Sequence, residues 1–144
     1  MAKLRGGVVG ALVLDAEGLI KLASGDVRTR ARFEGTKRYR GRIVTAASTL
    51  TEVLRGGNKD AELHRILKDV DVVTIDERVG RAAGELLGRT GMSGHRDALD
   101  ALLAVIALAQ SRPVVLLTSD PRDLEKLTEE PERPKHERIN VVTV

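Results

Sequence analysis

The chain has 144 residues and a formal net charge of +3, which is enough material for one ordinary domain with a hydrophobic core. It contains no cysteine, which excludes disulfides, thiolate metal sites and a cysteine nucleophile. No apolar run reaches the roughly 18 residues of a membrane span, and the apolar run near the N-terminus ends at Asp15, unlike a signal peptide. We therefore expect a single-domain cytoplasmic protein over residues 1–144.

The first half of the chain alternates apolar, β-branched runs with helical patterns. In chain order, the expected elements are a buried strand over 8–14, a helical turn over 16–22, a basic and partly helical segment over 25–41 broken at Gly35, and a strand over 42–46. A helix follows, which Ser48 or Thr49 caps and which stops at Gly56 and Gly57. Glu52 lies on this helix.

The second half repeats this alternation. Its expected elements are an amphipathic helix over 59–68, a strand over 70–75, a helix over 76–87 capped by Asp76, a loop over 88–94, a helix over 97–109 capped by Asp97, a strand over 113–117, a helix over 121–127 with Pro121 in its first position, and a strand over 139–144. The regular alternation predicts an α/β fold with a central, largely parallel sheet between two layers of helices.

A basic block lies between residues 28 and 42, where seven Lys or Arg residues accompany a single acid, Glu34. The block also holds Phe33 and Tyr39, which are the only Phe and Tyr of the chain. Basic residues interleaved with aromatic ones can bind a nucleic-acid backbone and stack on bases. In the alternative interpretation both aromatic rings pack inward and the charges are solvated.

Four acids stand at the ends of predicted elements or on helices near them. Asp15 follows the first strand, Asp120 follows the strand over 113–117, Asp100 lies in the first turn of the helix over 97–109, and Glu52 lies on a helix of its own. Ligand sites of parallel sheets form outside the carboxyl ends of the strands. Carboxylates brought together there repel one another unless a cation binds them, and oxygen ligands without Cys or a His cluster suit Mg²⁺ or Mn²⁺. Two such ions about 3.5–4 Å apart can promote phosphodiester hydrolysis.

Each acid also has a structural interpretation. Asp15 and Asp120 can cap the helices that follow them, and Glu52 alone would be an ordinary solvated glutamate. For Asp97 and Asp123, helix capping and a favourable first-turn position are the preferred explanations. Asp100 is the hardest to explain structurally, because it lies just inside a wholly apolar helix.

Four segments carry a resemblance to PIN-domain ribonucleases, and more narrowly to the VapC toxins of bacterial type II toxin–antitoxin pairs. They are LDA at 14–16, LTEVLRG at 50–56, DALDALL at 97–103 and LTSDPRDL at 117–124. The resemblance covers nearly the whole chain and implies a PIN-like three-layer α/β/α fold. One departure is the bulky, basic stretch over 94–96 before Asp97, which can place Arg96 near the scissile phosphate.

The resemblance implies a Mg²⁺- or Mn²⁺-dependent endoribonuclease that acts as a toxin. The acids that would bind the metal and perform catalysis are Asp15, Glu52, Asp100 and Asp120, with Asp97 as a further candidate and Thr118 as a supporting hydroxyl. It also implies an RNA substrate, neutralisation by a small VapB-like antitoxin, and a homodimer.

Three other functions are compatible with the sequence. A housekeeping PIN nuclease would share the chemistry without a toxin role. A phosphatase or phosphotransferase could use Asp15 as nucleophile, since residues 14–18 are loosely similar to the start of haloacid dehalogenases, but that family needs a second Asp where Glu17 stands. A degenerate PIN or receiver-like module would act through binding alone.

Overall fold

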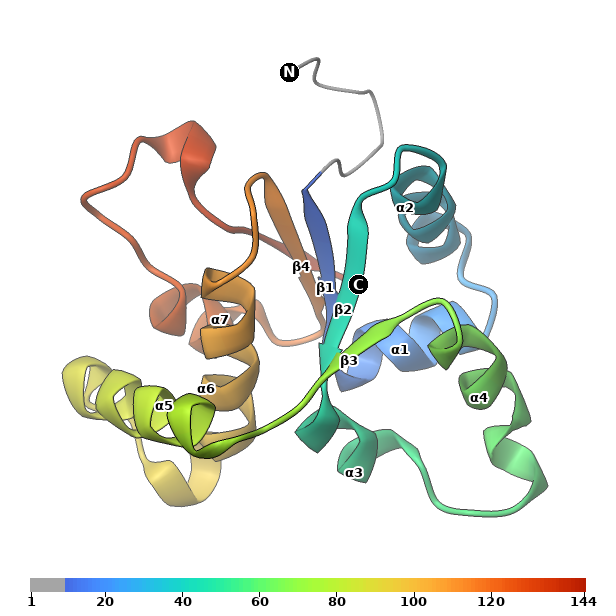
Figure 1. The fold of residues 1–144 in the computed structure, drawn as a ribbon, viewed down its shortest axis with the longest axis horizontal. Helices are drawn as coiled ribbons and strands as arrows, with labels where there is room; N and C mark the ends of the chain where they lie inside the picture. Colours follow the sequence, from blue (N-terminus) through green and yellow to red (C-terminus); the bar gives the residue numbers. More distant parts are fainter. Residues whose placement is uncertain (1–9) are drawn as a thin grey trace.

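The computed structural model describes residues 10–144, and its centre is a five-stranded sheet in which all neighbouring strands are parallel (Figure 1). The strands lie in the order β3-β2-β1-β4-β5. Their bounds are Ala11–Leu14 for β1, Arg42–Ala46 for β2, Asp71–Val73 for β3, Val114–Thr118 for β4 and Asn140–Thr143 for β5. The predicted strands all form, and the part of the first one at residues 8 and 9 lies outside the described residues.

Helices cover both faces of the sheet, which confirms the predicted three-layer α/β/α fold. The helices on one face are α1 (Ala16–Ala23), α2 (Val27–Arg38), α3 (Leu50–Val53) and α4 (Ala61–Leu67), and those on the other are α5 (Glu77–Thr90), α6 (Gly94–Leu108) and α7 (Pro121–Leu127). Short 3₁₀ turns occupy Ala47–Thr49, Asn58–Asp60 and Lys135–Glu137. No helix within residues 10–144 is long and apolar enough to cross a membrane.

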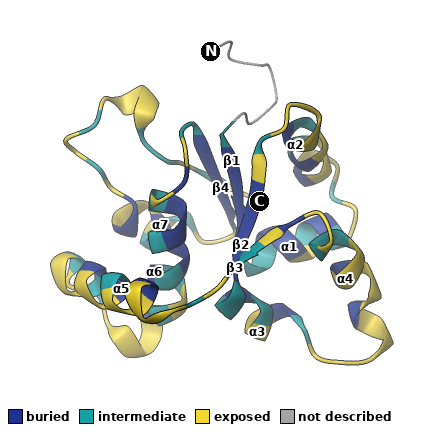
Figure 2. Cartoon of the chain, viewed as in Figure 1, coloured by how far each residue is buried: buried dark blue, intermediate teal, exposed yellow. Residues whose placement is uncertain are grey.

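Alternate residues of each central strand point into two separate hydrophobic cores, as the pleat of a strand requires. Val13 and Leu116 pack with α5, α6 and α7, whereas Leu14 and Leu117 pack with α1, α2, α3 and α4. All four side chains are fully buried, and the central strands stand out as buried in Figure 2. Burial on both faces explains why these strands are continuous apolar runs in the sequence.

Several predicted boundaries are wrong. The helix expected to stop at Gly56 and Gly57 is the short α3, which ends at Val53, and neither Ser48 nor Thr49 caps it through its side chain. Gly35 does not break its helix, because α2 continues to Arg38 around the buried Thr36. The expected loop over 88–94 is short, because α5 continues to Thr90 and ends at Gly91 in the left-handed conformation that favours glycine. Helix α6 begins at Gly94, so Asp97 lies inside its first turn and is not its N-cap.

The strand order creates a topological switch between β1 and β4. From β1 the chain adds β2 and β3 on one side, and then crosses over to add β4 and β5 on the other. The register pairs Leu14 with Leu117, so the carboxyl ends of β1 and β4 lie side by side. A crevice outside these ends is where open α/β sheets bind ligands.

Gly10 provides a test of how closely the chain packs at the opposite, amino end of β1. A Cβ atom at Gly10 would lie 2.2 Å from the carbonyl oxygen of Pro113 and 2.3 Å from that of Ser111. We expect Gly10→Ala to lower the free energy of unfolding by about 1–3 kcal/mol, because backbone must move to admit the methyl group. The matched control is Gly80→Ala within α5, where no atom lies within 4 Å of the new methyl group.

The control substitution should raise the free energy of unfolding by about 0.5–1 kcal/mol, because alanine loses less backbone entropy than glycine in a helix. Urea titrations of the two variants measure both effects. Equal effects of the two substitutions would contradict the close approach at Gly10.

Candidate active site

Asp15 links the ends of β1 and β4. Its carboxylate Oδ1 accepts a hydrogen bond from the backbone N–H of Gly18 at 2.8 Å, so it caps α1 as its structural interpretation predicts. The carboxylate also accepts a hydrogen bond from the Thr118 hydroxyl. That hydroxyl in turn accepts one from the backbone N–H of Asp120 at 3.1 Å. The end of β4 therefore fixes the Asp15 side chain.

Asp100 and Asp120 approach the same place from two other elements. Because α6 begins at Gly94, Asp100 lies in its second turn, and not in its first as predicted. The buried residues Leu103 and Ala104 hold that part of α6 in the core. Asp120 occupies the N-cap position of α7, but its side chain makes no capping hydrogen bond, so the predicted cap is wrong and its carboxylate remains available.

Glu52 comes from α3, the short helix that follows β2. The nearby Arg55 does not pair with the Glu52 carboxylate. Its guanidinium donates to the backbone carbonyl oxygens of Thr51, Glu52 and Leu54 at 2.8–3.1 Å. Arg55 therefore satisfies the end of α3 and leaves the acid without a cationic partner there.

All four acids predicted from the sequence line one small cavity of about 190 Å³. Thr118 lines it as well. A second, larger cavity of about 750 Å³ adjoins it and shares Asp100 and Asp120 with it. The structure thus brings the four acids together at the switch point between β1 and β4.

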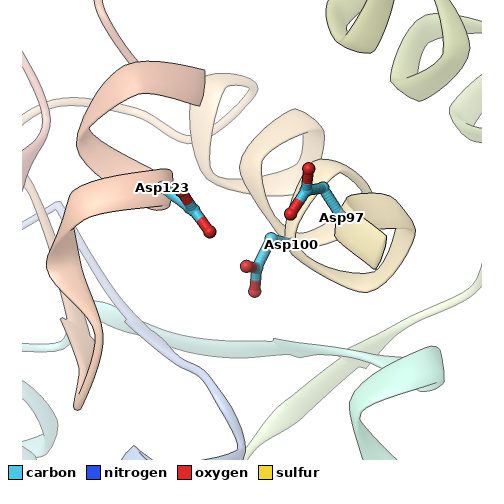
Figure 3. A group of neighbouring side chains, drawn as sticks. All are labelled: Asp97, Asp100 and Asp123. Atoms are coloured by element: carbon cyan, nitrogen blue, oxygen red, sulfur yellow. The ribbon is translucent and has the colours of Figure 1, made fainter. Parts of the chain in front are cut away.

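A second acidic group overlaps the first (Figure 3). Asp97, Asp100 and Asp123 each offer a carboxylate oxygen, and these atoms all lie within 4.8 Å of one another. Asp97 is only 2 % exposed, and its Oδ2 accepts the backbone N–H of Ser93 at 3.1 Å. This group was not predicted, because the sequence favours structural explanations for Asp97 and Asp123. The sequence feature that indicates it is the three-residue spacing of Asp97 and Asp100, which places them one helical turn apart.

Burial and mutual repulsion perturb the acids. Burial, followed by the charges of Asp123, Asp15, Asp97 and Asp120, raises the pKa of Asp100 to about 6. Burial also raises the pKa of Asp15, against the opposing hydrogen bonds from Thr118 and Gly18. Glu52 is exposed as a residue, but partial desolvation of its carboxyl group, together with Asp100 and Asp15, raises its pKa. The raised pKa values of Asp15, Glu52 and Asp100 show that too little positive charge lies near these acids to stabilise their ionised forms.

Neighbouring basic side chains neutralise little of the negative charge of these acids. Among residues 10–144, one ion pair involves an acid of either group, Arg96 Nε to Asp97 Oδ1 at 3.4 Å. The basic block lies on α2 and at the start of β2, near the amino ends of the strands and thus away from the acids (Figure 1). Its Phe33 is buried as the inward-packing interpretation predicts, whereas Tyr39 is 43 % exposed, so that interpretation is wrong for Tyr39.

Comparison with known proteins identifies the family of the chain. The sequence profile of the PIN domain matches residues 12–130. The chain belongs to the PIN domain family. No curated protein sequence matches the chain.

Several solved structures share the fold at low sequence identity. VapBC2 from Rickettsia felis, bound to a DNA fragment from its promoter, superposes with a TM-score of 0.66 at 14 % identity over 93 % of this chain and 98 % of that one. VapBC-1 from nontypeable Haemophilus influenzae gives 0.58 at 18 % identity over 92 % and 97 %. A toxin–antitoxin complex from Klebsiella pneumoniae gives 0.56 at 18 % identity over 78 % and 88 %.

The raised pKa of Asp100 predicts that its ionisation destabilises the metal-free fold. The pKa rises from 3.8 in the unfolded chain to about 6 in the folded one, so the stability associated with the protonated form is complete below pH 3.8 and is lost as the pH rises through 6. Removing the charge with Asp100→Asn should raise the free energy of unfolding at pH 7 by about 1–2 kcal/mol after allowance for solvent screening.

Urea unfolding in the presence of EDTA measures this gain. The gain should shrink towards zero as the pH is lowered to about 3, where the wild-type carboxyl group is largely protonated in both states. A gain that is independent of pH would show that charge is not its cause.

Proposed function

We propose that the chain is a Mg²⁺- or Mn²⁺-dependent endoribonuclease that acts as the toxin of a type II toxin–antitoxin pair. The observation that carries the proposal is the convergence of Asp15, Glu52, Asp100 and Asp120 at the switch point, with raised pKa values for three of them. Membership of the PIN domain family supports a nuclease. The likeness in fold to two VapBC complexes and a further toxin–antitoxin complex supports the toxin role.

The donor set fits a divalent metal ion. It consists of carboxylates alone, which are the ligands that hard cations prefer, and it has a deficit of positive charge that a divalent ion would remove. Asp15 and Asp100 would be the principal ligands, with Glu52 and Asp120 completing the set. Such an ion lowers the pKa of a bound water and stabilises the charge that develops on phosphodiester oxygens.

The protein groups have separate tasks in this proposal. The Thr118 hydroxyl and the Gly18 amide hold Asp15 in one orientation, and the buried body of α6 holds Asp100. Glu52, which like Asp120 is exposed, would orient the attacking water. In this division the two less exposed acids, Asp15 and Asp100, are the fixed ligands, and the exposed Glu52 and Asp120 complete the site.

The remaining parts of the proposal concern partners and location. We propose a small VapB-like antitoxin as the partner, a homodimer as the assembly, and the cytoplasm as the compartment. Growth arrest on expression, relieved by co-expression of a small protein from the adjacent reading frame, would support the toxin role. Cleavage of RNA without growth arrest would favour a housekeeping PIN nuclease.

Removal of single carboxylate charges tests the catalytic assignment. We expect Asp15→Asn, Asp100→Asn and Glu52→Gln each to lower metal-dependent RNA cleavage by more than about a hundredfold, because even groups that only support a metal ligand contribute 10–100-fold. The matched control is Glu125→Gln on the exposed surface of α7, which should cleave like the wild type. Full activity in the Asp15 or Asp100 variant would contradict the mechanism.

Metal binding tests the same site without reference to activity. At a Mn²⁺ concentration of about 100 times its Kd, the free energy of unfolding should rise by about 2.7 kcal/mol, which corresponds to about 2–4 °C in Tm for each kcal/mol. The double variant Asp15→Asn, Asp100→Asn should show little of this shift. A wild-type protein without the shift would favour a binding module, and phosphate release from a small phosphomonoester would favour the phosphatase alternative.

A further inference from the structure

The larger cavity contains two arginine residues that the proposed mechanism does not use. Arg96 comes from the first turn of α6 and Arg122 from the first turn of α7, and both line the cavity beside Asp97, Asp100, Asp120 and Asp123. Two different elements therefore bring a guanidinium to the same hollow. This cavity adjoins the small one through Asp100 and Asp120.

Both guanidinium groups have donors to spare. Arg96 is 79 % exposed in its side chain and uses only Nε, in the 3.4 Å contact with Asp97, which leaves its two terminal nitrogens without a partner among the described residues. Arg122 is exposed, and its guanidinium makes no hydrogen bond or ion pair with any residue between 10 and 144. By contrast, the guanidinium of Arg112 is engaged with Glu130 and with backbone carbonyl oxygens.

The charge and size of the cavity indicate what these donors would bind. Its four acids outnumber its two arginines, so an anion bound there would depend on the two guanidinium groups for its attraction. A planar guanidinium with free terminal N–H groups matches the oxygens of a phosphate. The volume of about 750 Å³ lies within the roughly 300–1,000 Å³ range of small-ligand pockets, whereas the neighbouring 190 Å³ is below it.

We infer that Arg96 and Arg122 form a subsite for the phosphate next to the scissile one, so that the preferred substrate is RNA with at least one further phosphate on this side of the acids. The inference rests on the proposed nuclease function and states on which side of the acids the RNA chain continues. The scissile phosphodiester lies by the shared residues Asp100 and Asp120, and the neighbouring nucleotide occupies the larger cavity. Arg96 and Arg122 are positioning residues here.

Fluorescence anisotropy with a fluorescein-labelled single-stranded RNA of random sequence, in an Asp15→Asn background with Mg²⁺, tests the subsite. Arg96→Gln and Arg122→Gln should each weaken binding by about tenfold, because each removes a charge-assisted hydrogen bond. The slope of log K against log salt should become shallower by about 0.7 for each arginine. The matched control is Arg78→Gln, an exposed arginine in the first turn of α5 that lines neither cavity.

Competition against the labelled RNA separates the subsite from a general charge effect. A trinucleoside diphosphate, with two phosphates, should compete better than a dinucleoside monophosphate, with one, and the double variant Arg96→Gln, Arg122→Gln should lose this preference. A retained preference with wild-type affinity would overturn the inference. An altered Mn²⁺ affinity in calorimetry with a retained preference would also overturn it, because the arginines would then only compensate the acids.

The inference and the function on which it rests fail in different ways. Wild-type protein that neither binds nor cleaves RNA contradicts the proposed function, and the inference fails with it. Wild-type protein that cleaves RNA, with arginine variants that bind like the Arg78→Gln control, contradicts the inference alone.

Discussion

The pairing of β1 with β4 is the constraint on which the rest of the molecule depends. It joins the two halves of the sheet, and its register places Leu14 beside Leu117 at the point where the chain reverses its direction of strand addition. Both strands are buried on both faces, so the ends of the pair are fixed by two hydrophobic cores at once. The backbone of the acids that follow these strands is therefore fixed by close packing, which limits how far their carboxylates can move apart.

This rigidity helps to explain why the pKa values of the acids are raised in the metal-free protein. In water, several carboxylates would separate and remain ionised. Here the fold partly buries Asp100 and holds it near Asp123 and Asp15, and burial, followed by the charges of these acids, raises its pKa. Holding ionised acids close together therefore lowers the free energy of unfolding, as is common at functional sites. The proposed divalent ion would offset this cost by supplying the positive charge that the acids lack.

The strand positions, the layered fold and the four acids at the switch point were predictable from the sequence, because apolar runs fully buried in a parallel sheet leave a strong pattern. Helix ends were less predictable. Asp97 resembled an N-cap, and only the structure shows that α6 starts three residues earlier and that Asp97 reaches back to Ser93 from inside the helix. The group of Asp97, Asp100 and Asp123 depends on how α6 meets α7, which no local pattern encodes.

Asp100 and Asp120 border both cavities, so ligands bound in the two cavities, as proposed, would be thermodynamically linked. An occupant of one cavity that changes the charge or orientation of these two side chains changes the affinity of the other cavity by some factor. By reciprocity, the second occupant must change the affinity of the first by the same factor. Cation and polyanion would thus each act as an effector of the other's binding, within a single site and without any change of fold.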